Sequence, residues 1–459
     1  MKITILGGAG VRTPSIIQAF SRRQDNIGVD ELCLMDINQE RLGLIGCITE
    51  ELEKSGKIHF RVSRTVDAQE ALDNADFVIT TFRVGDIESR IIDEKIALEN
   101  GILGQETTGA GGFSMALRTI PVLGNYITMM KKLCPEAWLI NFANPSGILT
   151  EFIHQKSDWQ RAVGICDGPE SMRHFAGHLL DVDYHEIYLD YFGLNHLGWV
   201  RKVFYQGNDL LPSILKNIKG SPIYKELPFD DAIYQSLGMI PNEYNYYYYY
   251  AKKAVNNIRK AEQSRGEQIK ELNDLLFKDL KVIRGNYGEL TRRYSKYQLD
   301  RWETYMKAET GKFTEINDAQ FDQINVDEQN EEGYSGVALD LIEGLIGKKP
   351  QVIILNIQNE GAIDGIDPNA VVEIPAYVGK DLIRPMNVGK IPAHCLGLMN
   401  QVKNYEQLTI EAAVKSSYKD AVSALTFHPL IADHELAKRL VDCYGMAHGD
   451  YYPKLIKDK

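Results

Sequence analysis

A cysteine and a histidine, each held in an apolar segment, are the residues in this sequence best suited to bind a metal ion. Cys166 ends the apolar run 163–166 and precedes a turn at 167–169, and His196 lies in the glycine-bounded run 193–198. A thiolate and an imidazole are good ligands for a divalent transition ion, and two protein ligands leave positions for water or substrate oxygens. On spacing alone, however, a buried thiol and a hydrogen-bonded core histidine are the better explanation.

A second chemical feature is a glycine-rich turn at 7–10, between a predicted strand and the helix that follows it. Glycines at such a turn let the backbone approach a pyrophosphate, whose charge then meets the free amides and the positive dipole end of the helix. Gly8, Gly10 and Val11 are the candidate contacts. The fingerprint is imperfect because Thr13 occupies the position of a third glycine, so a plain structural strand-turn-helix is the alternative.

Asp36 strengthens the dinucleotide interpretation because it closes the second predicted strand. An acidic side chain at this place accepts hydrogen bonds from the ribose hydroxyls of the adenosine half of a dinucleotide. A carboxylate there would also repel a 2′-phosphate, which favours NAD over NADP. The turn and this acidic residue together predict an NAD site.

The elements that position these residues alternate between strand and helix in the first part of the chain. Strand-like runs lie at 2–6, 31–35, 76–81 and 138–141. Helical patterns lie between them, and such alternation predicts an α/β fold with a Rossmann-type, doubly wound parallel sheet. We therefore assign residues 1–193 to an NAD-binding domain.

After about residue 193 the sequence changes to longer helical stretches, such as 251–279 and 402–425. We assign residues 194–459 to an α+β, largely helical domain for substrate binding and oligomerisation. An acidic segment at 317–333 is expected to be an exposed loop. With 459 residues and 44% hydrophobic content, the chain is long enough to build two such cores.

The charge and composition exclude several classes of partner. A net charge of −12 gives no general attraction to nucleic acid or to an anionic membrane, so a phosphorylated ligand would need its own cluster of arginines. No apolar run reaches the roughly 20 residues that span a bilayer. The first residues lack the pattern of a secretory leader, and the six cysteines are scattered singly. We expect a cytoplasmic protein that acts on a small molecule, with no nucleic-acid or membrane partner.

Short motifs along nearly the whole chain, taken in order, resemble glycoside hydrolase family four, whose members are glycosidases dependent on NAD and a divalent metal. The motifs are found at 5–10 with 13–14, 82–85, 104–107 with 111–112, 144–145, 166–169, 195–196 and 241–250. No single motif is decisive, but their joint order is highly specific. The resemblance changes the interpretation of Cys166 and His196 to a metal-binding pair, with manganese as the usual ion.

The resemblance implies a reaction that begins with oxidation of a sugar at C3 by NAD, which makes the C2 proton acidic. A base removes that proton, the glycosidic oxygen leaves C1 by elimination, water adds, and the hydride returns to C3. The family's base falls on Tyr244, with Tyr247, Tyr248 or plain aromatic packing as alternatives. A cation beside a tyrosine suits this task because it lowers the pKa from its usual value of about 10. Asp167 matches the residue that protonates the departing group in some members, or it orients a metal ligand.

The resemblance also implies a 6-phosphorylated substrate. Arg265 matches the arginine that grips the sugar 6-phosphate, and a guanidinium fork suits a phosphate; a surface ion pair is the alternative. Arg83 and Asn144 match further substrate-contacting positions, although Arg83 could equally be a structural partner for an acid. Glu106 is a candidate for hydrogen bonds to sugar hydroxyls.

The anomer of the substrate is the finest of these expectations. The Asp-Gly-Pro that follows Cys166 matches neither the β nor the α members fully, whereas the turn at 10–14 and the segment 374–379 are closest to 6-phospho-beta-glucosidases. We therefore expect a 6-phospho-beta-glucosidase, with a 6-phospho-alpha-glucosidase as the alternative. The rivals from other classes are an NAD-dependent dehydrogenase of the lactate and malate type and a catalytically silent sensor of sugar phosphate or NAD. Family members are commonly dimers or tetramers, so we expect a homodimer or homotetramer.

Overall fold

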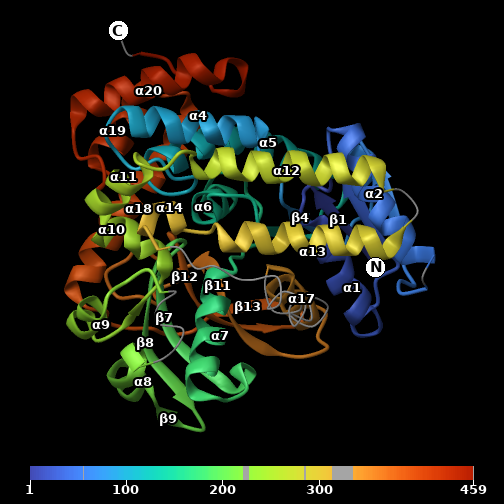
Figure 1. Cartoon of the computed structure of the whole chain (residues 1–459), viewed down its shortest axis with the longest axis horizontal. Helices are drawn as coiled ribbons and strands as arrows, with labels where there is room; N and C mark the ends of the chain where they lie inside the picture. Colours follow the sequence, from blue (N-terminus) through green and yellow to red (C-terminus); the bar gives the residue numbers. More distant parts are fainter. Residues whose placement is uncertain (55, 221–226, 284–285, 313–333, 458–459) are drawn as a thin grey trace.

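One continuous mixed sheet, flanked by helices, runs through the centre of the molecule (Figure 1). The protein is described by a computed structural model, which covers residues 1–54, 56–220, 227–283, 286–312 and 334–457. The acidic segment at 317–333 lies outside the described residues. The strands are β1 (Lys2–Leu6), β2 (Glu31–Met35), β3 (Arg61–Thr65), β4 (Phe77–Thr80), β5 (Trp138–Asn141), β6 (Ala162–Gly164), β7 (Ile187–Leu194), β8 (Leu197–Tyr205), β9 (Asn208–Asp209), β10 (Ile240–Pro241), β11 (Gln351–Gln358), β12 (Val371–Gly379) and β13 (Leu382–Pro385).

The first half of the sheet is parallel and has the strand order of a Rossmann fold. β3, β2, β1, β4, β5 and β6 lie side by side in that order, each parallel to its neighbours. Every residue of β4 and β5 is buried, because helices cover both faces of a parallel sheet. The predicted doubly wound α/β fold is therefore confirmed. Three predicted strands coincide with β1, β2 and β5, and β4 is one residue shorter at each end than the prediction.

The sheet continues without a break into an antiparallel half. β6 pairs with β11 where Gly164 faces Asn356, and β12, β7, β8 and β10 follow in that order. The domain boundary predicted between residues 193 and 194 falls inside β7. The two halves of the chain thus share one sheet, and their division into two domains stays a prediction.

The helices of the second half are more broken than the sequence patterns predict. The helices are α1 (Thr13–Ile27), α2 (Gln39–Lys54), α3 (Ala68–Leu72), α4 (Asp86–Glu99), α5 (Ala110–Leu133), α6 (Ser146–Lys156), α7 (Gly168–Leu180), α8 (Leu211–Asn217), α9 (Asp231–Leu237), α10 (Tyr246–Tyr249), α11 (Ala251–Ile258), α12 (Arg265–Val282), α13 (Tyr287–Glu303), α14 (Lys307–Thr310), α17 (Tyr334–Leu345), α18 (Ala393–Lys415), α19 (Tyr418–Phe427) and α20 (His434–His448). None of them, in the described part of the chain, combines the length and apolarity needed to cross a membrane.

Both helical stretches predicted in the second half divide into two helices, which corrects the prediction. The stretch 251–279 divides into α11 and α12 because Ser264 and Glu267 form a capping box that starts α12. The stretch 402–425 spans α18 and α19 because Ser416 adopts a left-handed conformation, with φ of 52°, that ends α18. In each case, known helix-capping behaviour explains why the helix ends or begins at that residue.

α12 and α13 lie side by side across one face of the molecule (Figure 1). α13 is fastened to the start of α1, because the Tyr294 hydroxyl donates a hydrogen bond to the Val11 carbonyl oxygen at 2.8 Å. The Ser15 hydroxyl lies 2.7 Å from the same Tyr294 oxygen. The helix pair therefore packs beside the glycine-rich turn that precedes α1.

Candidate active site

A cavity of about 1560 Å³ lies at the carboxyl ends of the parallel strands. This is where open α/β sheets bind their ligands. The volume exceeds the roughly 300–1,000 Å³ of a site for one small molecule, so the cavity has room for a cofactor and a substrate together. Every site residue predicted from the sequence lines it except Gly8; these are Gly10, Val11, Arg83, Glu106, Asn144, Asp36, Cys166, Asp167, His196, Tyr244 and Arg265.

The glycine-rich turn is shaped by close backbone contacts. The amides of Gly7 and Gly8 both donate hydrogen bonds to the Met35 carbonyl oxygen, at 2.9 and 2.8 Å. Gly7 has a φ of +100°, and a Cβ there would lie 2.5 Å from the Phe82 nitrogen. A Cβ on Gly8 would lie 2.8 Å from the Leu34 Cβ, so Gly8 faces β2 rather than the cavity. Gly8 thus lets the turn pack on the sheet, and its neighbours Gly7 and Ala9 line the cavity.

Asp36 lies directly beside the glycine-rich turn and is held by backbone amides. Its carboxylate accepts hydrogen bonds from the amides of Ala9 at 3.1 Å and Asn38 at 2.9 Å. Burial nevertheless raises the pKa of Asp36. Nearby, Arg41 forms an ion pair with Asp86, and both side chains line the cavity. Nothing in the local sequence pattern separates Arg41 and Asp86 from surface charges, so the sequence does not predict this pair.

The sheet brings Cys166 and His196 together, although thirty positions separate them in the chain. Cys166 follows β6, and His196 forms the turn between β7 and β8 with a φ of 63°. The Cys166 Sγ lies 3.6 Å from the His196 Nε2. Burial lowers the pKa of His196 to about 4, so its ring is neutral near pH 7. Burial also raises the pKa of Cys166 well above its usual value.

Hydrogen bonds behind His196 set which ring nitrogen is free. The Thr107 hydroxyl donates to the Gln105 Oε1 at 3.2 Å, so its oxygen is left to accept the His196 Nδ1 proton at 2.7 Å. The Nε2 that faces Cys166 then carries a lone pair. This is the arrangement by which protein metal sites orient a histidine ligand.

These residues fit a divalent metal ion with two protein ligands. Among the described residues, no group of three or more His, Cys, Asp or Glu side chains has the geometry to hold a metal ion. Cys166 and His196 would therefore leave the other coordination positions to water or substrate. Asp167, directly after Cys166, has its Oδ1 3.9 Å from the thiol sulfur and its Oδ2 3.7 Å from the Arg12 Nη1.

Of the candidate tyrosines, Tyr244 is the one that contacts His196, a predicted metal ligand. Its ring stacks on His196 with a centroid distance of 3.8 Å and an interplanar angle of 5°. Tyr247 lines the cavity behind it, whereas Tyr248 packs toward His428 and does not line the cavity. Burial, followed by the neighbouring Glu243, raises the pKa of Tyr244 well above its usual value. A nearby cation is therefore required for its ionisation near neutral pH.

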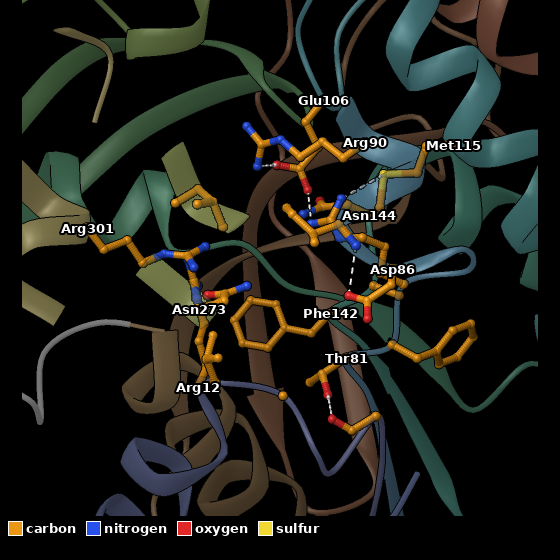
Figure 2. Close-up of a pocket in the computed structure, with 18 of the residues that line it drawn as sticks. Arg12, Thr81, Asp86, Arg90, Glu106, Met115, Phe142, Asn144, Asn273 and Arg301 are labelled. Carbon is orange, nitrogen blue, oxygen red and sulfur yellow. Dashed lines mark hydrogen bonds and ion pairs between the residues drawn. The ribbon is translucent and has the colours of Figure 1, made fainter. Parts of the chain in front are cut away.

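Paired charges surround Glu106 in the wall of the cavity. Its two carboxylate oxygens separately accept hydrogen bonds from Arg83 and, at 2.5 Å, from Arg90. Figure 2 shows Glu106 and Arg90 facing each other close to Asn144. Burial favours neutral Glu106, but the two arginines outweigh it and hold its pKa far below the usual range. Arg83 is thus a partner for an acid, and Glu106 is engaged in holding the two arginines.

Arg265, the first residue of α12, also lines the cavity. It donates hydrogen bonds to Thr304, to Gln268 at 3.4 Å and to the Arg301 carbonyl oxygen at 2.7 Å. A guanidinium has five N–H donors, so these three bonds leave two for a ligand. Burial, then Arg90 and Arg301, lower its pKa to about 10. A buried arginine repelled by two others is suited to an anion rather than to a surface ion pair.

Arg301, which was not among the site residues predicted from the sequence, lines the cavity from α13. Figure 2 shows it at the left of the view, reaching toward Asn273. Burial lowers the pKa of Arg301, and its Nη1 donates a hydrogen bond to the Tyr297 hydroxyl at 3.0 Å. On the same helix Arg292 is exposed, and no sequence signal separates the two. The cationic end of the cavity is therefore larger than predicted.

Comparisons with known proteins agree with this site. Residues 2–182 match the family model described as Family 4 glycosyl hydrolase, and residues 191–431 match its C-terminal domain. A probable 6-phospho-beta-glucosidase of Bacillus subtilis is 30% identical, over 99% of this chain and 98% of that protein. The structure of the Thermotoga maritima 6-phospho-beta glucosidase with NAD and glucose-6-phosphate is 30% identical, with a TM-score of 0.84 over 99% of both chains. A 6-phospho-alpha-glucosidase from gut microorganisms, solved with NAD and Mn2+, is 28% identical, with a TM-score of 0.84 over 99% of both chains. The chain therefore belongs to glycosyl hydrolase family 4, which makes it a glycosidase.

Proposed function

We propose that this chain hydrolyses 6-phosphorylated glucosides with the help of NAD and a divalent metal ion, manganese being the first candidate. The observation that carries the proposal is the meeting of Cys166, His196 and Tyr244 in one cavity that the glycine-rich turn, Asp36 and several arginines also line. The relatives solved with NAD, Mn2+ and glucose-6-phosphate support the same set of ligands.

Separate sets of residues in this chain contact NAD and the metal ion. The amides of the turn around Gly10 and Val11 and the Asp36 carboxylate face the cofactor, and the Cys166 thiolate with the His196 Nε2 holds the metal ion. When bound, NAD supplies a reversible hydride acceptor for C3 of the sugar, and the metal ion a Lewis acid for the sugar oxygens. No hydroxy-acid substrate is needed for this use of NAD, since the hydride returns to the same sugar.

The substrate is held by its phosphate, and its ring faces the base. Arg265 offers two free N–H donors to the 6-phosphate, with Arg301 and Arg90 adding positive charge. Asn144 lines the cavity near Arg90 and Glu106 and is placed to hydrogen-bond the sugar. Tyr244, ionised to a tyrosinate that the neighbouring cation would stabilise, then removes the C2 proton with its phenolate oxygen.

We favour β-linked substrates, because the relatives from Bacillus subtilis and Thermotoga maritima are named as 6-phospho-beta-glucosidases. Relatives named for α-linked phosphoglucosides, among them the maltose-6′-phosphate glucosidase of Fusobacterium mortiferum, are 28% identical or less. In an elimination no nucleophile attacks C1 in line with the departing group, so the chemistry does not itself fix the anomer. A cytoplasmic location and a homodimer or homotetramer remain predictions.

The test is hydrolysis of 4-nitrophenyl 6-phospho-β-glucoside and of its α-anomer, each with and without NAD and Mn2+. Release of nitrophenol only when both are present, with no net NADH, is the expected result. Arg265→Ala is expected to lower kcat/KM for the phosphorylated substrate by about 30- to 1,000-fold, the loss of about 2–4 kcal/mol of charge-assisted hydrogen bonding. Arg259→Ala, which removes an exposed arginine outside the cavity, is the matched control. Equal losses for phosphorylated and unphosphorylated glucosides would contradict the phosphate role of Arg265.

A further inference from the structure

Two carboxyl side chains line the cavity near Cys166 and His196, and their surroundings differ. Asp167 lies 3.7 Å from an Arg12 nitrogen and immediately precedes α7, whose N-terminus carries a partial positive charge. Its side chain is 44% exposed. Asp167 thus has a cationic partner and lies 3.9 Å from the Cys166 sulfur, a position suited to supporting the cysteine beside it.

Glu243 has the opposite surroundings. It forms no hydrogen bond or ion pair with a cationic side chain among the residues that the structure describes. Its Oε1 accepts a hydrogen bond from the Tyr305 hydroxyl at 2.7 Å. Burial, with a further contribution from the charge of Asp167, raises the pKa of Glu243 to about 7. Paired carboxyl groups whose environments differ in this way take different roles in catalysis.

Glu243 lies close to the proposed base, since its charge adds to the effect of burial in raising the pKa of Tyr244 and both residues line the cavity. It directly precedes Tyr244 in the short 3₁₀ turn Glu243–Asn245. C1, which carries the departing oxygen, is bonded to the C2 from which Tyr244 takes a proton. Tyr305 joins this point to the phosphate end, because its ring centroid lies 6.0 Å from the Arg265 Cζ while its hydroxyl binds Glu243.

The cavity also opens to solvent beside Glu243. Trp302 and Tyr305 line it and are 57% and 38% exposed. A departing group of variable size needs such an opening. We propose that Glu243, rather than Asp167, is the catalytic residue that protonates the departing glycosidic oxygen, an inference that rests on the proposed function.

The proton balance of the step is simple. After Tyr244 has taken the C2 proton, the C2 electron pair forms a C1–C2 double bond, and the C1–O bond breaks with its electrons going to oxygen. The proton on the Glu243 Oε2 moves to that oxygen, since Oε1 is held by Tyr305. In the next step water adds to C1, the Glu243 carboxylate takes the proton of that water, and Tyr244 returns a proton to C2. Glu243 thus ends protonated, as it began.

The experiment compares two substrates that differ in their need for an acid. Nitrophenolate departs readily without a proton, whereas methoxide does not. Glu243→Gln is expected to lower kcat/KM for methyl 6-phospho-β-glucoside by at least about 100-fold, the usual contribution of a general acid. For 4-nitrophenyl 6-phospho-β-glucoside the loss is expected to stay below about 10-fold, because that substrate does not use the acid. Asp167→Asn should lower activity on both substrates by the same factor and weaken Mn2+ binding.

Isotope exchange distinguishes this role from a structural one. In D2O with NAD and Mn2+, methyl 6-phospho-β-glucoside recovered from Glu243→Gln should carry deuterium at C2, because proton removal continues while departure of the group is blocked. Glu262→Gln, a change at an exposed carboxyl outside the cavity, is the control, and NAD binding reports folding. Equal losses on the two substrates, absence of deuterium, or a substrate-dependent loss in Asp167→Asn instead would each overturn the assignment. If the unaltered protein neither cleaves nor exchanges, the proposed function itself fails and takes this assignment with it.

Discussion

Replacing Thr107 with valine tests how His196 is prepared to bind a metal ion. The Thr107 hydroxyl accepts the His196 Nδ1 proton at 2.7 Å and donates its own proton to Gln105. Valine has nearly the same shape but no hydroxyl, so the variant keeps the packing of this buried position. It leaves the Nδ1 proton without its acceptor. The ring can then place its proton on Nε2 instead, where it would face Cys166 and block metal binding.

The magnitude follows from the hydrogen bond that is lost. Leaving a buried donor without a partner costs about 1–3 kcal/mol. Removal of a residue that orients a metal-bound histidine lowers metal affinity by about 10- to 100-fold, which corresponds to about 1.4–2.7 kcal/mol. The two figures agree. Thr107→Val is therefore expected to raise the Kd for Mn2+ by about 10- to 100-fold, a change consistent with both the cost of the lost hydrogen bond and the usual effect on metal affinity.

Titration of Mn2+ into the NAD-loaded protein by isothermal calorimetry measures this change. Thr119→Val is the matched control, because Thr119 is also buried and donates to the Met115 carbonyl oxygen within α5, but does not itself line the cavity. Its Kd for Mn2+ should equal that of the unaltered protein. A Kd for Thr107→Val within about threefold of the unaltered value, below the range expected for such residues, would refute the role assigned to the Thr107 hydroxyl.

Two further predictions concern the dinucleotide end. Asp36→Ser should weaken NAD binding by about 10- to 100-fold, since hydrogen bonds to a carboxylate contribute about 1.5–3 kcal/mol. It should also reduce the preference for NAD over NADP. Fluorescence titration with both nucleotides measures the two affinities, and unchanged affinity for each would contradict the prediction. Gly7→Ala should lower the melting temperature strongly, because its Cβ would lie 2.5 Å from the Phe82 nitrogen at a φ of +100°. Gly28→Ala, with a φ of +70° and no atom within 4 Å of the added Cβ, should lose only about 1–2 kcal/mol from the left-handed backbone; equal shifts would show that contact with Phe82 is unimportant.

The strands of the parallel half could be predicted because their signal is local. β1, β2 and β5 are short apolar runs buried on both faces, and turn residues mark their ends. The break between α11 and α12 was also present in the sequence, since Ser264 and Glu267 have the spacing of a capping box. It was missed because the flanking residues keep a helical pattern on both sides. The antiparallel half could not be predicted, because the pairing of β6 with β11 joins segments nearly two hundred residues apart.

Among the site residues, too, some carry a local sequence signal and others do not. Cys166 and His196 are conspicuous by type, but only the sheet puts their side chains 3.6 Å apart. Glu243, Arg90 and Arg301 carry no local signal, because a charged residue on a helix or turn has the same sequence pattern whether it faces water or a cavity. Burial decides their chemistry, and burial depends on which distant helix covers them. Residue type could therefore nominate the metal-binding pair, whereas the charges that surround it required the tertiary structure.

The helix pair α12 and α13 contacts the chain beside the glycine-rich turn and also carries Arg265. Tyr294 on α13 hydrogen-bonds the Val11 carbonyl oxygen beside the glycine-rich turn. Farther along the same helix, the Arg301 carbonyl oxygen accepts a hydrogen bond from Arg265 at the start of α12. The predicted cofactor site and the predicted phosphate site are thus covered by the same pair of helices. An ordinary dehydrogenase must exchange its nucleotide in every turnover, but in the proposed reaction the hydride returns to the sugar that gave it. A helix pair that is hydrogen-bonded beside the predicted nucleotide site suits that reaction, because only the sugar has to enter and leave.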